Sequence, residues 1–191
     1  ILEGVDAVMT NQAGVCIGVS TADCIPVLLY DEEHHAVAAI HAGWRGTLAR
    51  IVHKTIQEMA FTYHTDPKKL KAVIGPGISL DSFEVGDEVY EAFEQAAFPM
   101  EEIAEQRPNA AFSADPAERE RLAAEGNIVQ PLKWHLNLPL CNKQILLHCG
   151  VAEENIQDCG ICTFLHSDEY FSARKLGTES GRIYTAILLE K

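Results

Sequence analysis

Long apolar runs and basic residues are what this 191-residue sequence most lacks. No stretch approaches the roughly 18 consecutive apolar residues that a membrane-spanning helix requires, and no charged segment followed by an apolar one opens the chain. Only 15 Lys and Arg stand against 28 Asp and Glu, which gives a formal net charge of −13. This balance disfavours a general nucleic-acid binder and a protein held on anionic lipid. We therefore expect a cytoplasmic protein with no nucleic-acid partner and no membrane partner.

Aromatic residues are also scarce, at 7%, but apolar residues make up 47% of the chain, which is enough to bury a core. The six Cys residues are not needed as disulfides in a chain of this size, so free thiols are expected. We expect a single domain over residues 1–191. Because residues 5–8 already have the apolar pattern of a strand, we also expect that domain to lack its natural N-terminal segment.

Alternating and continuous apolar segments predict a chain of mixed strands and helices. Strands are expected at 15–20, 25–30, 36–40, 70–74, 156–162 and 183–189. Helical spacing of apolar residues predicts helices at 47–63, 87–98 and 138–148. The polar segment 100–126 predicts an exposed helical excursion that begins at Asp115-Pro116 and ends at Gly126-Asn127. This mixture, with several hairpin-length connections, predicts an α+β or mixed α/β fold built in layers.

Cys24 and His41 are the first candidate site residues, since each lies at one end of a predicted hairpin. If segments 25–30 and 36–40 pair across the turn between them, residues whose numbers add up to 65 or 66 face each other, and Cys24 and His41 satisfy this. Cross-strand partners have Cβ atoms roughly 4.5 to 5.5 Å apart. The two side chains would then be close enough to bind one metal ion or to share a proton.

Three interpretations of this pair remain open from the residues alone. A thiolate and an imidazole suit zinc or copper, and a catalytic zinc takes three protein ligands and keeps one open position. Alternatively, Cys24 is a nucleophile and His41 its base. The plainest interpretation is a buried thiol and an unrelated histidine at a strand end. Asp23, beside Cys24, either orients His41 or serves as a turn residue, and the turn role is favoured.

Cationic residues near glycine-rich turns are candidates for binding an anion. The segment Gly43-Trp44-Arg45-Gly46 precedes a predicted helix, so helix-start N–H groups and the Arg45 guanidinium could converge on one point. Plain turn chemistry explains the same glycines. Near the C-terminus, Arg174, Lys175 and Arg182 cluster in an otherwise acidic chain. They indicate either a phosphate clamp or a solvated basic loop.

These motifs together resemble a known family, the YfiH-like or laccase-domain family, also called multicopper polyphenol oxidases. The resemblance covers nearly the whole chain, and the sixteen residues between Cys24 and His41 agree with the family's spacing. It rests on Thr21-Ala22-Asp23-Cys24, on His41-Ala42-Gly43-Trp44-Arg45-Gly46, on Ile74-Gly75-Pro76-Gly77-Ile78 followed by Phe83-Glu84-Val85-Gly86, and on Phe171-Ser172 with Arg174 and Gly181-Arg182.

The resemblance implies a layered α/β/β/α fold with mixed sheets, similar to that of cysteine-dependent bacterial toxin deamidases. It implies a metal site formed by Cys24, His41 and a further histidine that would lie upstream of residue 1. The chain departs from the family pattern at Ala173-Arg174-Lys175, where an aromatic residue and two arginines are usual, and at Asn137, where an aspartate is common. These departures bear on substrate preference.

The resemblance further implies a zinc-dependent purine nucleoside enzyme, with copper as an alternative metal. The implied reactions are phosphorolysis of adenosine, inosine, guanosine or methylthioadenosine and hydrolytic deamination of adenosine. Nucleoside and phosphate would be the small-molecule partners. Cys24, His41 and Arg45 would be the catalytic residues, and Arg45, Arg174 and Arg182 would hold phosphate or substrate. The alternatives are a Cys-His hydrolase or amidase acting on a cell-wall precursor, a copper-dependent polyphenol oxidase, and a non-catalytic protein with a structural metal.

Overall fold

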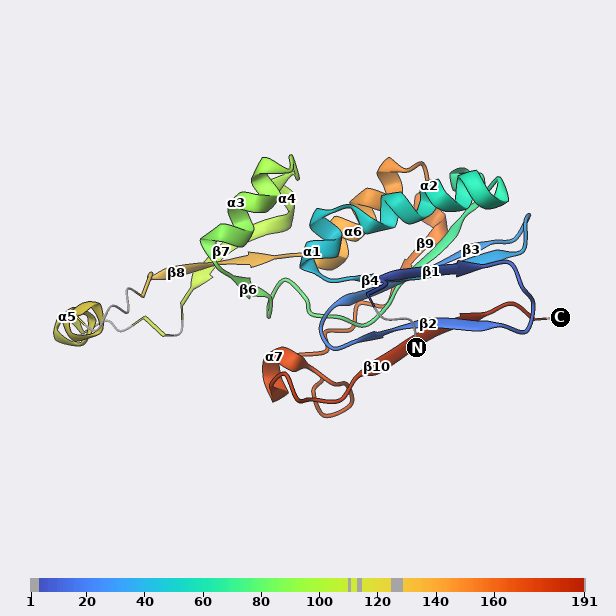
Figure 1. The fold of residues 1–191 in the computed structure, drawn as a ribbon. Helices are drawn as coiled ribbons and strands as arrows, with labels where there is room; N and C mark the ends of the chain where they lie inside the picture. The colour runs from blue at the N-terminus through green and yellow to red at the C-terminus, as the bar shows by residue number, and fades with distance from the viewer. Residues whose placement is uncertain (1–3, 110, 113–114, 125–128, 191) are drawn as a thin grey trace.

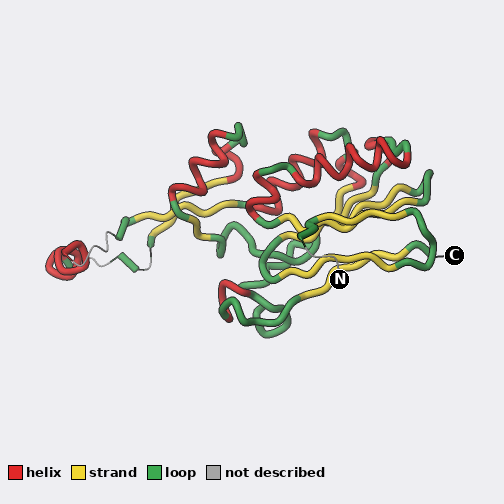
Figure 2. Tube along the Cα trace, viewed as in Figure 1, coloured by secondary structure: helices red, strands yellow, loops and turns green. Residues whose placement is uncertain are grey.

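Three layers stack in the body of the molecule (Figures 1 and 2). The computed structural model describes residues 4–109, 111–112, 115–124 and 129–190. Helices α1 (Trp44–Leu48), α2 (Ile51–Tyr63) and α6 (Leu138–His148) cover one face of a five-stranded sheet, and a two-stranded sheet lies against the other face. The predicted mixed α/β fold with mixed sheets is therefore confirmed.

The five-stranded sheet has the order β1-β4-β3-β5-β9. Its parallel pair is β5 with β9, and its other neighbours are antiparallel, so the sheet is mixed. The strands are β1 (Ala7–Thr10), β3 (Ile25–Asp31), β4 (Ala36–Ala42), β5 (Lys71–Ile74) and β9 (Ile156–Asp158). Strands β3 and β4 are apolar along their length because helices cover one face and the second sheet covers the other.

Strand β4 lies at the centre of the core, and each of its residues except His41 is buried. Its small alanine side chains allow α2 to pack closely on the sheet, where Val52, Ile56 and Met59 contribute the apolar face of the helix. The rest of this strand therefore positions His41 rigidly, because close packing on both sides leaves its backbone no room to move.

The two-stranded sheet pairs β2 (Cys16–Thr21) with β10 (Ile183–Leu188) in antiparallel register, from Ile183 opposite Thr21 to Leu188 opposite Cys16. Both strands alternate between more and less exposed residues, as expected for a sheet with one face on the core and one in water. Both strands were predicted from the sequence and are confirmed within one residue at each end.

The single helix predicted over 47–63 is wrong in one respect, because the structure divides this segment into α1 and α2. Arg50 adopts a left-handed backbone, with φ of 54°, and interrupts the helical path. Thr47 fixes α1 in place, since its hydroxyl donates to the Ala42 carbonyl and accepts from the Asn142 amide of α6. The reversal at Arg50 then directs α2 along the sheet.

The helical excursion predicted over 100–126 is also partly wrong. After α4 (Met100–Ile103), the chain forms β7 (Ala104–Pro108), which pairs with β8 (Leu132–Leu136) in a three-stranded sheet completed by β6 (Glu84–Val85). Helix α3 (Asp87–Gln95) packs on this sheet, where Tyr90 stacks on Trp134 with ring centroids 3.9 Å apart. Helix α5 (Pro116–Ala124) begins as predicted and lies beyond the three-stranded sheet, on the side away from the five-stranded sheet (Figure 1). Its predicted end at Gly126-Asn127 lies outside the described residues.

The remaining elements are short. The 3-10 turns η1 (Pro67–Lys69) and η2 (Glu153–Asn155) precede β5 and β9, and α7 (Ala173–Leu176) follows a long loop. The strand predicted over 156–162 is too long, because β9 ends at Asp158 and only an isolated bridge joins Cys162 to Gly77. No helix in the described part of the chain is long and apolar enough to span a bilayer.

Candidate metal and substrate site

Cys24 and His41 lie on the same face of the β3–β4 hairpin, although the register differs from the predicted one. Ile25 faces Ala42 and Pro26 faces His41, so the pairing is shifted by two residues from one that places Cys24 opposite His41. A shift of two residues keeps every side chain on its face, because side chains alternate with period two. Cys24 and His41 are thus diagonal neighbours. The prediction that the hairpin brings them together is confirmed, although the predicted register is wrong.

Gly43 leaves the space in which the two side chains meet. A Cβ atom placed on Gly43 would lie 3.0 Å from Cys24 Sγ and 3.7 Å from His41 Nε2. The glycine of the predicted anion-binding turn therefore has a second role, which is to keep the point between sulfur and nitrogen clear of side-chain atoms.

Asp6 contacts the other side of the His41 imidazole. The Asp6 Oδ1 and His41 Nδ1 atoms are 3.0 Å apart, and this contact directs Nε2 toward Cys24. The hydrogen bond with Cys24 raises the pKa of His41 most, burial opposes it, and the Asp6 carboxylate adds to the increase, so the pKa rises from 6.5 to about 9. The sequence did not indicate Asp6, because it lies 35 residues from His41 and only the β1–β4 pairing joins them.

Arg45 lies one residue beyond Trp44 at the start of α1, with its guanidinium carbon 4.1 Å from the Trp44 ring centroid. Its side chain is exposed, and it forms no ion pair with any carboxylate among the residues that the structure describes. Arg45 can therefore reach an anion without first breaking a salt bridge. Its predicted role in holding phosphate remains a prediction.

Asp23 connects the turn before Cys24 to the C-terminal loop. Its two carboxylate oxygens accept from the Thr163 hydroxyl and the Arg174 backbone N–H, each at 2.7 Å. Asp23 also has a left-handed backbone, with φ of 78°, which agrees with the favoured turn interpretation. It does not contact His41 in these hydrogen bonds; its buried carboxylate instead positions the segment that carries Arg174.

The two C-terminal arginines differ in how far their guanidinium groups are already occupied. Arg174 donates one hydrogen bond to the Glu84 carbonyl at 2.9 Å and lies over the Phe83 ring at 5.4 Å. Arg182 donates to three carbonyls of its own loop, those of Thr178, Ser180 and Gly181. In this conformation Arg182 holds the loop together, so of the two predicted phosphate ligands Arg174 has more free donors.

The residues that meet at Gly43 suit a zinc ion in kind. A thiolate and an imidazole nitrogen are ligands that zinc prefers, and a carboxylate on the far imidazole nitrogen is a common arrangement behind a metal-bound histidine. Within the described ranges, no group of three or more His, Cys, Asp and Glu side chains is placed to hold a metal. The structure thus brings two candidate ligands together, and their role as metal ligands, like the third ligand expected upstream of residue 1, stays a prediction.

A cavity of about 830 Å³ opens beside His41. Strands β1 and β2 line most of it, together with His41 and the exposed Tyr184 of β10. Cavities of about 300 to 1,000 Å³ are typical of small-molecule sites. The His41 imidazole is therefore accessible from a space large enough for a nucleoside.

Comparison with known proteins identifies the family. Residues 2–190 match the family model described as multi-copper polyphenol oxidoreductase laccase, and the chain belongs to this family. The resemblance that the sequence motifs indicated is confirmed.

Curated relatives share the sequence over nearly the whole chain. A purine nucleoside phosphorylase of Bacteroides thetaiotaomicron is 43% identical over 100% of this chain and 63% of its own length. Adenosine deaminase RL5, from an unknown prokaryotic organism, is 40% identical over 97% of the chain and 63% of its own length. The crystal structure of YlmD from Geobacillus stearothermophilus has a TM-score of 0.78 and 26% identity, covering 98% of this chain and 62% of that one. The chain thus spans less than two thirds of these relatives.

Proposed function

We propose that this chain carries the catalytic region of a zinc-dependent purine nucleoside enzyme whose main reaction is phosphorolysis. The observation that carries the proposal is the convergence of Cys24 Sγ and His41 Nε2 on the space in front of Gly43, with Asp6 behind the imidazole. Relatives named as a purine nucleoside phosphorylase and an adenosine deaminase support the substrate class.

Cys24 and His41 would hold the metal, and zinc, when bound, supplies a Lewis acid beside the substrate. The role of Cys24 is then that of a thiolate ligand rather than a nucleophile. His41 must bind through a neutral Nε2, so Asp6 would keep the remaining ring proton on Nδ1. The acidic partner thereby fixes both the tautomer and the orientation of the ring.

Phosphate would be held by Arg45, with Arg174 as the second cation. A phosphate oxygen forms a bond to C1′ of the ribose, the bond from C1′ to the base nitrogen breaks, and the departing base takes up a proton. The cations would hold the phosphate beside C1′, where its negative charge stabilises the positive charge that develops on the ribose as the base departs. The cavity beside His41 is large enough for the nucleoside.

Deamination of adenosine would be a second reaction of the same site. Water adds at C6 of the purine and ammonia leaves, so no phosphate is consumed. The two reactions are therefore separable by whether product formation depends on phosphate.

Elemental analysis of the purified protein, beside an assay for base release from inosine and adenosine with and without phosphate, tests this function. We expect about one zinc per chain, phosphate-dependent base release, and loss of both on chelation with recovery on adding zinc. Arg45→Gln should raise KM for phosphate by about 10-fold or more, whereas Lys54→Gln, on the exposed face of α2, should leave it unchanged. Release without phosphate, or at full rate after chelation, would contradict the proposal.

A Cys-His hydrolase acting on a cell-wall precursor is the second candidate, and one specific observation favours it. Asp6, His41 and Cys24 are joined in the order acid, base and thiol, which is the order of a catalytic triad. Under this reading activity survives chelation and is abolished when Cys24 is alkylated. Copper-dependent polyphenol oxidation, the activity in the family's description, would require several copper ions. It would therefore need many more ligands than zinc, whereas the candidate site has only Cys24 and His41 among the described residues.

A further inference from the structure

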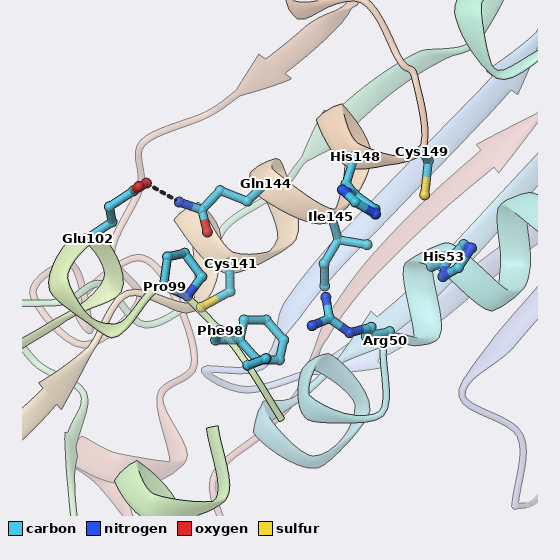
Figure 3. A pocket seen from close by; sticks show the side chains of 11 residues that line it. Arg50, His53, Phe98, Pro99, Glu102, Cys141, Gln144, Ile145, His148 and Cys149 are labelled. Atoms are coloured by element: carbon cyan, nitrogen blue, oxygen red, sulfur yellow. Dashed lines mark hydrogen bonds between the residues drawn. The ribbon is translucent and has the colours of Figure 1, made fainter. Parts of the chain in front are cut away.

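A second cavity, of about 580 Å³, lies in the helix layer and takes no part in the proposed reaction (Figure 3). It is lined by the N-terminal end of α2, by α6, by α4 and by the connection between α3 and α4. The five-stranded sheet separates this layer from the cavity beside His41, which lies between β1 and β2. A ligand here would therefore be independent of the nucleoside site.

Arg50 places a positive charge on one side of this cavity. Its Nη2 donates to the Ala96 carbonyl at 3.0 Å, and its guanidinium carbon lies 4.4 Å from the Phe98 ring centroid. Its charge acts on the Cys141 and Cys149 thiols, where it opposes the increase in pKa caused by burial. No carboxylate in the described part of the chain forms an ion pair with Arg50, although acidic residues outnumber basic ones by nearly two to one. Most of its five N–H donors are thus available to an acid group.

The backbone at Arg50 supports a role beyond helix capping. Arg50 is the N-cap of α2 in the left-handed region, at φ of 54°, and its side chain makes no capping hydrogen bond. A non-glycine residue in this conformation costs free energy and persists only where its surroundings fix it. Here the strained backbone and the Phe98 ring together hold the guanidinium at the wall of the cavity.

The opposite side of the cavity offers hydrogen-bond acceptors and a negative charge. Gln144 Nε2 donates to Glu102 Oε2 at 2.6 Å, whereas the buried Gln144 Oε1 has no hydrogen-bond partner among the residues that the structure describes. A buried amide oxygen without a partner is destabilising, so a hydrogen-bond donor on a ligand would add stability here. The Glu102 carboxylate would repel a second acid group at this side.

The space between these two sides is apolar. Figure 3 shows Phe98, Cys141 and Ile145 between the Gln144–Glu102 pair and the side occupied by Arg50, His53 and His148. The thiols and imidazoles do not make this a metal site, because no three such groups come together within the described residues. The cavity instead has a cationic side, an apolar middle and an acceptor side.

We infer that this cavity binds a small amphipathic organic acid, with its acid group on Arg50, its flat apolar body against Phe98 and Ile145, and a hydroxyl or amino group on Gln144. Inorganic phosphate has no apolar body to fill the middle of the cavity. A dicarboxylate of the same shape places its second charge against Glu102. The arrangement therefore selects an acid with a donor at its other end.

Thiol protection measures this binding at the cavity itself. Cys149 is half-buried and lines the cavity, whereas Cys16 and Cys159 are exposed elsewhere and serve as internal controls. The probes are 4-hydroxybenzoate, benzoate and terephthalate, and the readout is the rate of iodoacetamide labelling of each cysteine by peptide mass spectrometry. We expect 4-hydroxybenzoate to slow labelling of Cys149 alone, benzoate to act more weakly, and terephthalate to act least.

A matched pair of variants tests the role of the cation. Arg50→Asn removes the charge and suits a left-handed backbone, and it should weaken protection by about 10- to 100-fold. Lys54→Asn removes the same charge four residues along α2, on its exposed side, and should leave protection unchanged. Arg50→Lys, which keeps the charge but loses the planar fork, provides a second variant should Arg50→Asn not fold, and is expected to bind with intermediate affinity.

Three results would overturn the inference. The first is the absence of Cys149 protection by 4-hydroxybenzoate at about 10 mM, a concentration at which even millimolar binding is nearly saturated. The second is equal protection in the Arg50 variants and the parent protein. The third is equal protection by terephthalate and 4-hydroxybenzoate, which would show that the Gln144 side does not select a donor.

Discussion

The Asp6 carboxylate lies 3.0 Å from His41 Nδ1, and this contact joins the residue that precedes β1 to the candidate site. The β1–β4 pairing, in which Ala7 faces Ile40, brings the two residues together. In the proposed enzyme Asp6 would act through His41 rather than on substrate, by fixing the tautomer that presents Nε2 to Cys24.

Replacing Asp6 by Asn should weaken zinc binding while leaving the fold intact. The uncharged amide still reaches Nδ1 but no longer stabilises the imidazole, so metal affinity should fall by about 10- to 100-fold. The pKa of His41 in the metal-free protein should fall below its value of about 9. Competition with a chromophoric chelator measures the first effect and an NMR titration of the His41 ring the second. Asp168→Asn, at an exposed carboxylate, is the matched control.

Metal-free protein should lose stability as the pH rises toward and past 9. The pKa of His41 is raised from 6.5 to about 9 by the Cys24 hydrogen bond and by Asp6, against the effect of burial. A raised pKa in the folded state stabilises the fold fully below about pH 6.5, and this contribution is lost as the pH rises through 9. Because 32% of the His41 side chain is exposed, solvent screening limits the contribution to about 1–2 kcal/mol.

Urea unfolding of the chelated protein between pH 6 and 10 measures this loss. His41→Gln should flatten that part of the curve, since the titrating group is gone. An unchanged slope in His41→Gln would assign the pH dependence to other groups.

Substituting Cys24 by Ala should abolish metal binding and lower base release by at least about 100-fold, because it removes one of the two metal ligands that we propose in this chain. The melting temperature of the metal-free protein should change little, since the thiol is only half-buried. Cys159→Ala, at an exposed thiol, should retain both zinc and activity. Base release retained in Cys24→Ala would refute the proposed zinc enzyme.

Gly43→Ala should disrupt the site without unfolding the protein. The new Cβ would lie 3.0 Å from Cys24 Sγ, so the thiol must move away from His41 Nε2. Zinc affinity should fall while the circular dichroism spectrum stays unchanged. Gly160→Ala serves as a comparison for stability, because no heavy atom lies within 4 Å of a Cβ there, although its φ of 65° adds strain. Full zinc content in Gly43→Ala would show that the site does not depend on this space.

Asp23→Asn should destabilise the C-terminal loop. Asn tolerates the left-handed backbone at this position, so the change removes mainly the charge that accepts from Thr163 and the Arg174 N–H. Loss of two charge-assisted hydrogen bonds at a buried carboxylate should lower the free energy of unfolding by about 2–3 kcal/mol. Thermal denaturation gives the stability, and hydrogen exchange at the Arg174 amide reports the loop directly. Unaltered exchange at that amide would rule out the tether.

The sequence by itself determined the family, most strands of the five-stranded and two-stranded sheets, and the proximity of Cys24 to His41. Continuous apolar segments and the short turn between them were sufficient, because hairpin geometry is local and a two-residue error in register preserves the face of every side chain. The motif glycines and arginines were likewise visible as residues, although not their partners. The helix break at Arg50 and the β7–β8 pairing were missed. The break depends on a backbone angle, and the pairing joins residues 24 to 32 positions apart on either side of a polar excursion.

Tertiary structure alone decided which groups surround these residues. Asp6 reaches His41 because β1 pairs with β4, and Asp23 holds the Arg174 segment 151 residues away. Arg50 meets Phe98 because the connection between α3 and α4 packs beside the start of α2. Such contacts leave no periodic signal in the chain, since they depend on how finished elements pack. Local patterns were therefore sufficient to find Cys24 and His41. Only the packing of the elements determines the protonation and orientation of the His41 ring and creates the second cavity beside Arg50.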